Sequence, residues 1–167
     1  NFGNQKYDLG IFDHFSKSYS KNFFLKKFLR DELYRGQINL WKHFNNKKKF
    51  KDLDLPKFGN LHGAIIENNF INFGAPVNQI YAKIIKNYLE SKKKNIIAEL
   101  GAGYGRLPYY YLKNEDNCCF IDFDLPEVLV LAAYYLIKSF PKKKYFLYGD
   151  ESFSKDLISN YDLIFLP

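Results

Sequence analysis

The 167-residue sequence predicts an α/β protein with a doubly wound, mostly parallel sheet in its C-terminal part and a helical extension before it. Three observations predict this class. From Asn95 onward, short continuous apolar runs alternate with helix-like segments, as in strands that are buried on both faces. A glycine-rich turn joins the first apolar run to the first of these helices. The earlier residues instead repeat apolar side chains at helical spacing. We therefore expect an extension over 1–75 and the sheet domain over 76–167.

The extension is predicted to be helical and irregular. The segment "FFLKKFLRDELYRGQINLWKHF" favours one helix, or two helices interrupted near Gly36. Glycines and prolines predict irregular connections after it, including "ENNFINFGAP". Pro76 suits the first turn of an amphipathic helix over "VNQIYAKIIKNYLESKKK". The expected apolar face of that helix consists of Val77, Ile80, Tyr81, Ile84, Ile85, Tyr88 and Leu89.

The remaining elements alternate between strand and helix. In chain order they are the strand "NIIAEL", a helix with its core at Pro108–Lys113, the strand "CCFIDFDL", the helix Pro126–Ser139, the strand "KKYFLYGD", a short helix at Lys155–Ile158 and the strand "YDLIFL". No internal repeat interrupts this pattern.

Composition narrows the classes of partner. The net charge is +7, but only Arg30, Arg35 and Arg106 of the 25 basic residues are arginines. Nucleic-acid sites usually recruit arginine, so we interpret the lysines as a solvated surface and expect no nucleic-acid partner. No run of about 18 uncharged apolar residues predicts a membrane span. Cys118 and Cys119 are neighbours on a strand and point to opposite faces, which favours reduced thiols in a cytoplasmic protein.

The turn after the first strand has the spacing E-x-G-x-G-x-G, from Glu99 to Gly105. A dinucleotide fingerprint would need its third glycine where Arg106 stands. An acid at the strand end favours a cationic group over a pyrophosphate. S-adenosylmethionine carries an ammonium, a sulfonium and a ribose but no phosphate, so it is the cofactor that we expect.

Acidic residues follow the next two strands. An acid roughly 20 residues beyond the glycine loop can accept the ribose hydroxyls, and both Asp122 and Asp124 qualify because they share strand parity. Asp124 is favoured since it lies nearer the carboxyl end of its strand. The alternatives are a lysine-paired Asp122 and an Asp124 that caps the following helix. Asp150 and Glu151 follow the third strand, as acceptors for an adenine amino group or as an ordinary acidic loop.

Together, "ELGAGYGRLPYYYL", "FDLPEVLVLAAYYLIKSFP" and "YDLIFLP" resemble the bacterial putative sugar O-methyltransferases, a family of class I S-adenosylmethionine-dependent methyltransferases with a Rossmann-like fold. With the upstream "FGAP", the resemblance spans roughly Glu67 to Pro167. "FDLP" and "GD" are also similar to plant phenolic O-methyltransferases. The resemblance implies that Asp124 holds the ribose and Asp150 the adenine. The other expected cofactor contacts are Glu99, Gly101, Ala102, Gly103, Tyr104, Leu125 and Glu151.

The reaction that the resemblance implies is methyl transfer to a hydroxyl of a sugar, sugar-nucleotide or glycan acceptor in bacterial surface glycan synthesis. It requires a general base. Among His14, His43 and His62, we favour His62 because it lies in an irregular segment that could cover the cofactor. The base is otherwise expected beyond Pro167. No H-x-x-H or C-x-x-C pattern predicts a metal site.

Two other functions stay open at this point. A nucleic-acid methyltransferase would suit the basic charge, but "DLIFLP" stands where an N-P-P-Y-like motif is usual. A non-catalytic module could keep the fold for S-adenosylmethionine binding or for assembly. Intact acids at Glu99, Asp124 and Asp150 argue against that reading.

The resemblance also implies a longer sheet than the sequence supplies. Methyltransferases of this class normally have seven strands, and four are predicted. The fourth is expected beside the first, with its far edge open and apolar near Pro167. The lack of methionine and the start at Asn1 lead us to expect a longer translated product.

Overall fold

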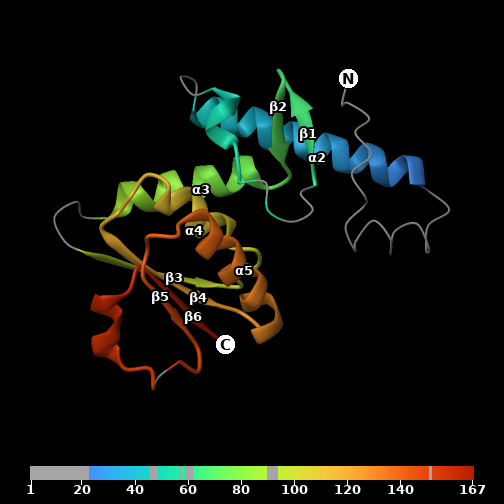
Figure 1. Ribbon diagram of the computed structural model, residues 1–167. Helices are drawn as coiled ribbons and strands as arrows, with labels where there is room; N and C mark the ends of the chain where they lie inside the picture. Colours follow the sequence, from blue (N-terminus) through green and yellow to red (C-terminus); the bar gives the residue numbers. More distant parts are fainter. Residues whose placement is uncertain (1–22, 46–48, 57, 59–61, 90–93, 151) are drawn as a thin grey trace. The chain divides into compact units, whose positions relative to one another are not determined.

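The computed structural model describes residues 23–45, 49–56, 58, 62–89, 94–150 and 152–167, with the side chains of 23–27 left out (Figure 1). The chain divides into two compact units, Asn1–Ile80 and Tyr81–Pro167.

The first unit is built on the helix α2 (Phe23–Phe44). It continues through Gly36, so of the two sequence predictions the single helix is confirmed. A Cβ added at Gly36 would meet nothing within 4 Å, and no packing constraint acts there. Tyr34, Ile38 and Trp41 are buried at helical spacing, and they form the core side of the helix.

A short 3₁₀ helix, η1 (Phe50–Leu53), and a β-hairpin complete this core. The hairpin pairs β1 (Gly63–Ile66) with β2 (Asn69–Asn72) in antiparallel register, so the prediction of irregular structure over this segment is wrong. Its two turn residues, Glu67 and Asn68, both have positive φ, at 48° and 63°. A two-residue turn with both φ positive matches the twist of hairpin strands, and asparagine tolerates that conformation well.

The helix α3 (Ala75–Tyr88) begins where Pro76 predicted it, but the expected apolar face is buried only in part. Ile80 and Ala82 are buried, whereas Tyr81, Ile84 and Tyr88 are exposed, Tyr88 to 84%. Gln79 is buried with both ends of its amide paired: Trp41 Nε1 donates to Gln79 Oε1, and Gln79 Nε2 donates to the carbonyl of Asp52 at 3.3 Å. A satisfied amide can thus replace an apolar side chain in this core.

The second unit is an α/β layer structure around a four-stranded parallel sheet. Its elements are β3 (Asn95–Leu100), α4 (Arg106–Leu112), β4 (Cys118–Phe123), α5 (Pro126–Ser139), β5 (Tyr145–Leu147), η2 (Lys155–Asn160) and β6 (Leu163–Leu166). Strands and helices alternate as predicted, and the arrangement is compatible with a Rossmann-like fold.

The strand order is β3-β4-β6-β5, which corrects one prediction. The last strand, β6, lies between β4 and β5 and not beside β3. All four β6 residues are buried, and a strand that is apolar on both faces is best placed in the interior of a sheet. One open edge is therefore β3, where Ile96 is 58% and Leu100 is 88% exposed.

Each face of the sheet has its own cover. On one face, Cys119, Ile121, Phe146, Ile164 and Leu166 form a core cluster, and Leu157 and Ile158 of η2 pack against it. On the other face, Phe120 meets Tyr111 of α4, with ring centroids 6.1 Å apart. Cys118 and Cys119 are both free and buried. No helix in the described part of the chain is long and apolar enough to cross a membrane.

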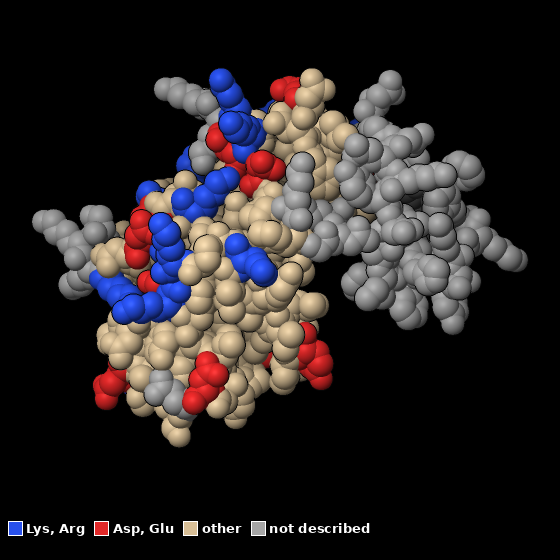
Figure 2. Space-filling model, in the orientation of Figure 1, with Lys and Arg blue, Asp and Glu red and all other residues tan. Residues whose placement is uncertain are grey.

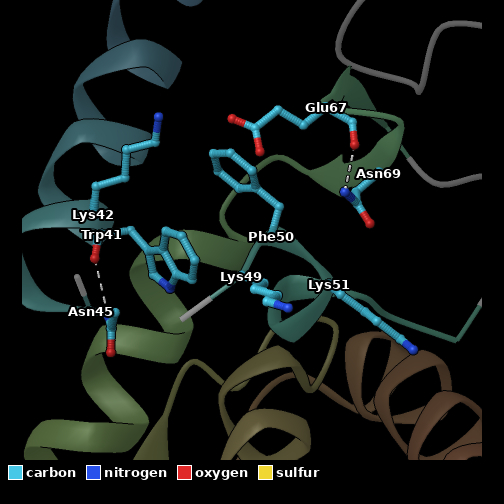
Figure 3. A pocket seen from close by; sticks show the side chains of 8 residues that line it. All are labelled: Trp41, Lys42, Asn45, Lys49, Phe50, Lys51, Glu67 and Asn69. Atoms are coloured by element: carbon cyan, nitrogen blue, oxygen red, sulfur yellow. Dashed lines mark hydrogen bonds between the residues drawn. The ribbon is translucent and has the colours of Figure 1, made fainter. Parts of the chain in front are cut away.

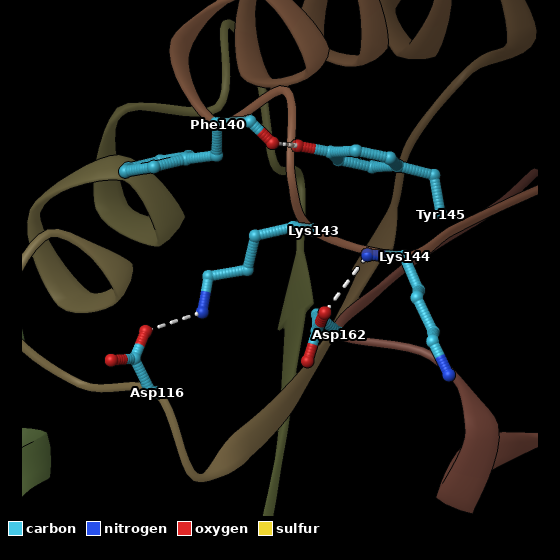
Figure 4. Close-up of polar contacts among 6 residues, drawn as sticks. All are labelled: Asp116, Phe140, Lys143, Lys144, Tyr145 and Asp162. Carbon is cyan, nitrogen blue, oxygen red and sulfur yellow. Dashed lines mark hydrogen bonds and ion pairs between the residues drawn. The ribbon is translucent and has the colours of Figure 1, made fainter.

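Polar contacts hold the loop before β5 at the amino ends of the strands (Figure 4). Lys143 Nζ lies 2.8 Å from Asp116 Oδ1, and the Lys144 backbone N–H donates to Asp162 Oδ2 at 2.8 Å. The Tyr145 hydroxyl donates to the Phe140 carbonyl at 2.5 Å. Part of the Lys142–Lys144 run is therefore used within the fold.

Candidate functional site

The glycine loop leaves the carboxyl end of β3 in a conformation that only glycine adopts easily. Gly101, Gly103 and Gly105 have φ of 78°, 56° and 75°. The Gly101 N–H donates to the Phe123 carbonyl at 2.7 Å, which holds the loop against the end of β4. A Cβ at Gly101 would meet nothing within 4 Å, and one at Gly103 only the Gly101 carbonyl oxygen at 3.9 Å. The space beside these two glycines is open to a ligand.

Gly105 serves packing. A Cβ there would lie 2.8 Å from Leu136 Cδ1 and 3.0 Å from its Cγ, so the close approach of α4 to α5 requires glycine. The next residue, Arg106, opens α4 beside the rings of α4 and α5, and its guanidinium carbon lies 6.0 Å from the Tyr104 ring centroid. The third glycine of the motif is thus explained by helix–helix contact.

Asp124 joins the glycine loop to the end of β4. Its Oδ2 accepts the Gly103 N–H at 2.8 Å, and its Oδ1 accepts the Leu125 N–H at 2.7 Å. It does not cap α5, because the N-cap residue is Leu125 and no side-chain cap bond is present. A carboxylate has about four acceptor positions, so Asp124 keeps capacity for a ligand while it orders the loop.

Glu99 and Asp122 are paired in register on β3 and β4. Asp122 is fully buried, and neither of its oxygens has a hydrogen-bond partner in the described structure. The predicted lysine partner is not there. The Glu99 Oε2 atom is likewise buried without a partner. Burial, reinforced by Glu99 and Asp124, raises the pKa of Asp122 to about 8, and burial together with Asp124 raises the pKa of Glu99 to about 7.

The same row of the sheet continues into an apolar cavity of about 410 Å³. Register pairs run from Glu99 to Asp122, from Asp122 to Phe165 and from Phe165 to Leu147, and side chains paired in this way project to one face. The cavity is lined by Pro126, Leu129, Val130, Ala133, Tyr134, Ile137, Leu147, Tyr148, Phe165 and Pro167. Figure 2 shows few charged side chains over the lower part of this face, where α5 and the C-terminal strands lie. The volume of this apolar cavity is typical of a small-molecule site.

The other predicted cofactor contacts differ in their exposure and in the residues they touch. Ala102 is buried, with its N–H donating to the Phe123 carbonyl at 3.3 Å, and Leu125 is exposed. The Tyr104 ring packs against Tyr135, with centroids 4.8 Å apart. Asp150 is exposed after β5, and its Oδ2 accepts the N–H of Leu147 at 3.4 Å.

Asp150 is not grouped with the other acids. β6 lies between β4 and β5, and two strand spacings separate the ends of those strands by about 10 Å. Glu151 lies outside the described residues. The cavity residues Phe165, Tyr134 and Tyr148 were not anticipated, because the exposure of Tyr134 and Tyr148 is a property of the folded chain.

The candidate base His62 belongs to the first unit. Its ring meets Phe73 edge to face with centroids 4.6 Å apart, and its carbonyl accepts the Phe73 N–H at 2.9 Å. His43 lies in the last turn of α2, and His14 is outside the described residues. The loop, Glu99 and Asp124 belong to the second unit.

The first unit has a cavity of its own, of about 760 Å³ (Figure 3). Trp41 and Phe50 stack in its wall with centroids 5.5 Å apart, and Lys42 Nζ lies 5.0 Å from the Phe50 centroid. Both rings are almost completely buried, so the accessible groups are mainly Lys42, Lys49, Lys51 and Glu67. The lining of this cavity is a mixture of polar and apolar surface, whereas that of the cavity in the second unit is mainly apolar.

Among the described residues, no group of three or more His, Cys, Asp or Glu side chains is arranged to hold a metal ion. No protein-family model matches the chain, and no curated protein or solved structure is significantly similar to it. The case for a function therefore rests on the residues and on their arrangement.

Proposed function

We propose that this chain is a cytoplasmic S-adenosylmethionine-dependent O-methyltransferase, and that the carboxyl ends of β3 and β4 bind the cofactor. The observation that carries the proposal is the open glycine loop tied to Asp124 and set beside Glu99. Glycines with positive φ let a ligand approach the backbone closely. In open parallel sheets, ligands collect at the carboxyl ends of the strands.

The charge of the site selects the class of ligand. Asp124 is hydrogen-bonded to the loop, and Glu99 lies near the end of the strand that leads into it, with Asp122 as its register partner; the negative charge that this group of acids carries together disfavours a phosphate. The same acids suit an ammonium or sulfonium group and can accept ribose hydroxyls. A dinucleotide or nucleoside triphosphate fits this setting less well than S-adenosylmethionine.

The cavity beside Phe165 supplies a surface for the adenine. It is apolar, it has the two tyrosines Tyr134 and Tyr148 in its lining, and its floor continues the row that begins at Glu99. A flat base gains from contact with aromatic and aliphatic side chains. Under this assignment the adenine lies over β6 and α5, and Asp150 is not needed to fix it.

The acceptor and the base are drawn from the resemblance to the putative sugar O-methyltransferases. We propose a hydroxyl of a sugar, sugar-nucleotide or glycan as acceptor. The site would align the sulfonium methyl with the hydroxyl oxygen, and a general base would remove the proton. His62 remains a candidate for that base.

Calorimetric titration with S-adenosylhomocysteine tests the proposal through Asp124→Ala. Loss of hydrogen bonds to a charged group should lower affinity by about 1.5–3 kcal/mol, or roughly 10- to 100-fold. The matched control is Asp156→Asn, which changes an exposed carboxylate on η2 and should bind like the wild type. Affinity of Asp124→Ala within twofold of the wild type would make the ribose assignment wrong.

A further inference from the structure

The most unusual group in the second unit is the carboxyl of Asp122. Its side chain has no exposed surface, and neither oxygen has a hydrogen-bond partner in the described structure. A buried carboxylate without partners is strongly unfavourable, and fold stability alone would select an apolar residue at this position. Phe120 on the same face of β4 and the register neighbour Phe165 are both buried, so this face of β4 and β6 is otherwise apolar.

Asp122 shares its surroundings with a second carboxyl. Glu99 is its register partner on β3, and one Glu99 oxygen is also buried without a partner. Neighbouring strands lie about 4.8 Å apart, so the two carboxyls cannot both be charged at low cost. One proton held between them removes that repulsion.

Other charged and titratable groups lie on the elements beside the pair. Asp124, at the end of β4, raises the pKa of both carboxyls. On α4, Arg106 interacts electrostatically with Tyr104, Tyr110 and Tyr135. On β6 the register neighbour of Asp122 is Phe165, which does not titrate. The groups that act on the pair are therefore mainly acidic, and a bound cation would reduce the repulsion between them.

We propose that Asp122 is a specificity-determining residue: with Glu99 it holds a proton in the free protein, and a cationic ligand displaces that proton to solvent. This inference rests on the proposed function, which supplies the ligand. S-adenosylmethionine carries one more positive charge than S-adenosylhomocysteine, because methyl transfer removes the sulfonium charge. The pair therefore favours the methyl donor over the product, and it regains a proton as the product leaves.

The test is calorimetric titration of the whole chain with S-adenosylmethionine and with S-adenosylhomocysteine, in two buffers of different ionisation enthalpy. Near pH 7 the donor should release about one proton and the product fewer. The affinity for the donor should rise about three- to tenfold between pH 6 and pH 7.5, since binding releases a proton.

Asp122→Asn keeps the shape of the side chain and removes the shared proton. It should at least halve the proton release with the donor and bring the two affinities within about twofold, while Asp156→Asn behaves like the wild type. A purely structural role would lower both affinities together and leave the proton count unchanged. If Asp122→Asn does not fold, the wild-type proton count decides by itself.

Binding of both compounds without proton exchange, at equal affinity at pH 6 and pH 7.5, would overturn the inference and leave the proposed function standing. Absence of binding for both compounds across this range would overturn the proposed function and the inference with it.

Discussion

The two ends of a single row across the sheet differ in what they contribute. At one end, Phe165 and Leu147 pack under α5 and line an apolar cavity. At the other end, Glu99 and Asp122 hold buried carboxyl oxygens without partners. The apolar end stabilises the fold, whereas the burial of unpaired carboxyl oxygens at the acidic end lowers its stability. The comparison teaches that a common backbone frame positions both ends, and that the stability of the fold does not account for the acidic end.

The largest effect is expected at the apolar end. Phe165→Ala removes a ring that is 2% exposed, and it should lower the free energy of unfolding by about 3–5 kcal/mol. Urea denaturation measures this value. Phe153→Ala is the matched control, because Phe153 is 41% exposed and its loss should change stability by less than about 1 kcal/mol. Equal losses in the two variants would mean that β6 is not the interior strand.

Two glycines of the loop have different roles: Gly105 packs against Leu136, and Gly101 faces open space. Gly105→Ala combines backbone strain with a clash against Leu136 and should cost about 2–4 kcal/mol of stability. Gly101→Ala meets only the strain of its φ and should cost about 1 kcal/mol.

Ligand binding should rank these two variants in the opposite order. Gly101→Ala places a methyl group in the open space of the loop, so it should weaken S-adenosylhomocysteine binding more than its effect on stability implies. Thermal melts with and without the ligand measure both quantities. A Gly101→Ala variant that binds normally would exclude the open side of the loop from the site.

At the acidic end, stability should depend on pH through Asp122. The unfolded chain loses this proton above about pH 4, whereas the folded chain keeps it up to about pH 8. The folded state then binds more protons, so the free energy of unfolding falls as pH rises through this window, by at most about 1.4 kcal/mol per pH unit. Asp122→Asn should remove the part of that slope that Asp122 contributes and leave the part that comes from Glu99, whose pKa is raised to about 7 by burial. Parallel slopes for both proteins in urea denaturation between pH 5 and pH 8 would contradict a neutral Asp122.

The smallest effect is expected at the amino ends of the strands, where polar contacts are satisfied. Tyr145→Phe removes the hydroxyl that donates to the Phe140 carbonyl at 2.5 Å and lies 3.2 Å from the Leu136 carbonyl oxygen. The loss should be about 1 kcal/mol of unfolding free energy, with no change in ligand affinity. A change in affinity would show that the two ends of the sheet are coupled.

Local patterns in the sequence predicted most elements of the second unit. The strand Asn95–Leu100 and the helix Pro126–Ser139 lie where the apolar runs and Pro126 indicated. The strand order did not follow from these patterns, because it depends on which strand buries most apolar surface when it lies between two others. In the first unit, the hairpin was missed because its turn residues, Glu67 and Asn68, carry no glycine.

The candidate site was predicted residue by residue but not as an arrangement. Spacing identified Glu99 and Asp124, but the register that pairs Glu99 with Asp122 is a tertiary property. The cavity was not predicted, because Leu147, Phe165 and Pro167 are apolar residues at strand ends like many others. Its shape depends on the insertion of β6 between β4 and β5.

The central claim is that this acidic glycine loop selects a cationic nucleoside over a phosphate-bearing one. The most direct measurement is calorimetric titration of the wild-type chain with S-adenosylmethionine and with NAD, side by side at pH 7.5. The predicted result is binding of S-adenosylmethionine with affinity at least about tenfold higher than that for NAD, a difference of about 1.4 kcal/mol. Tighter binding of NAD, or no binding of S-adenosylmethionine, would contradict the claim.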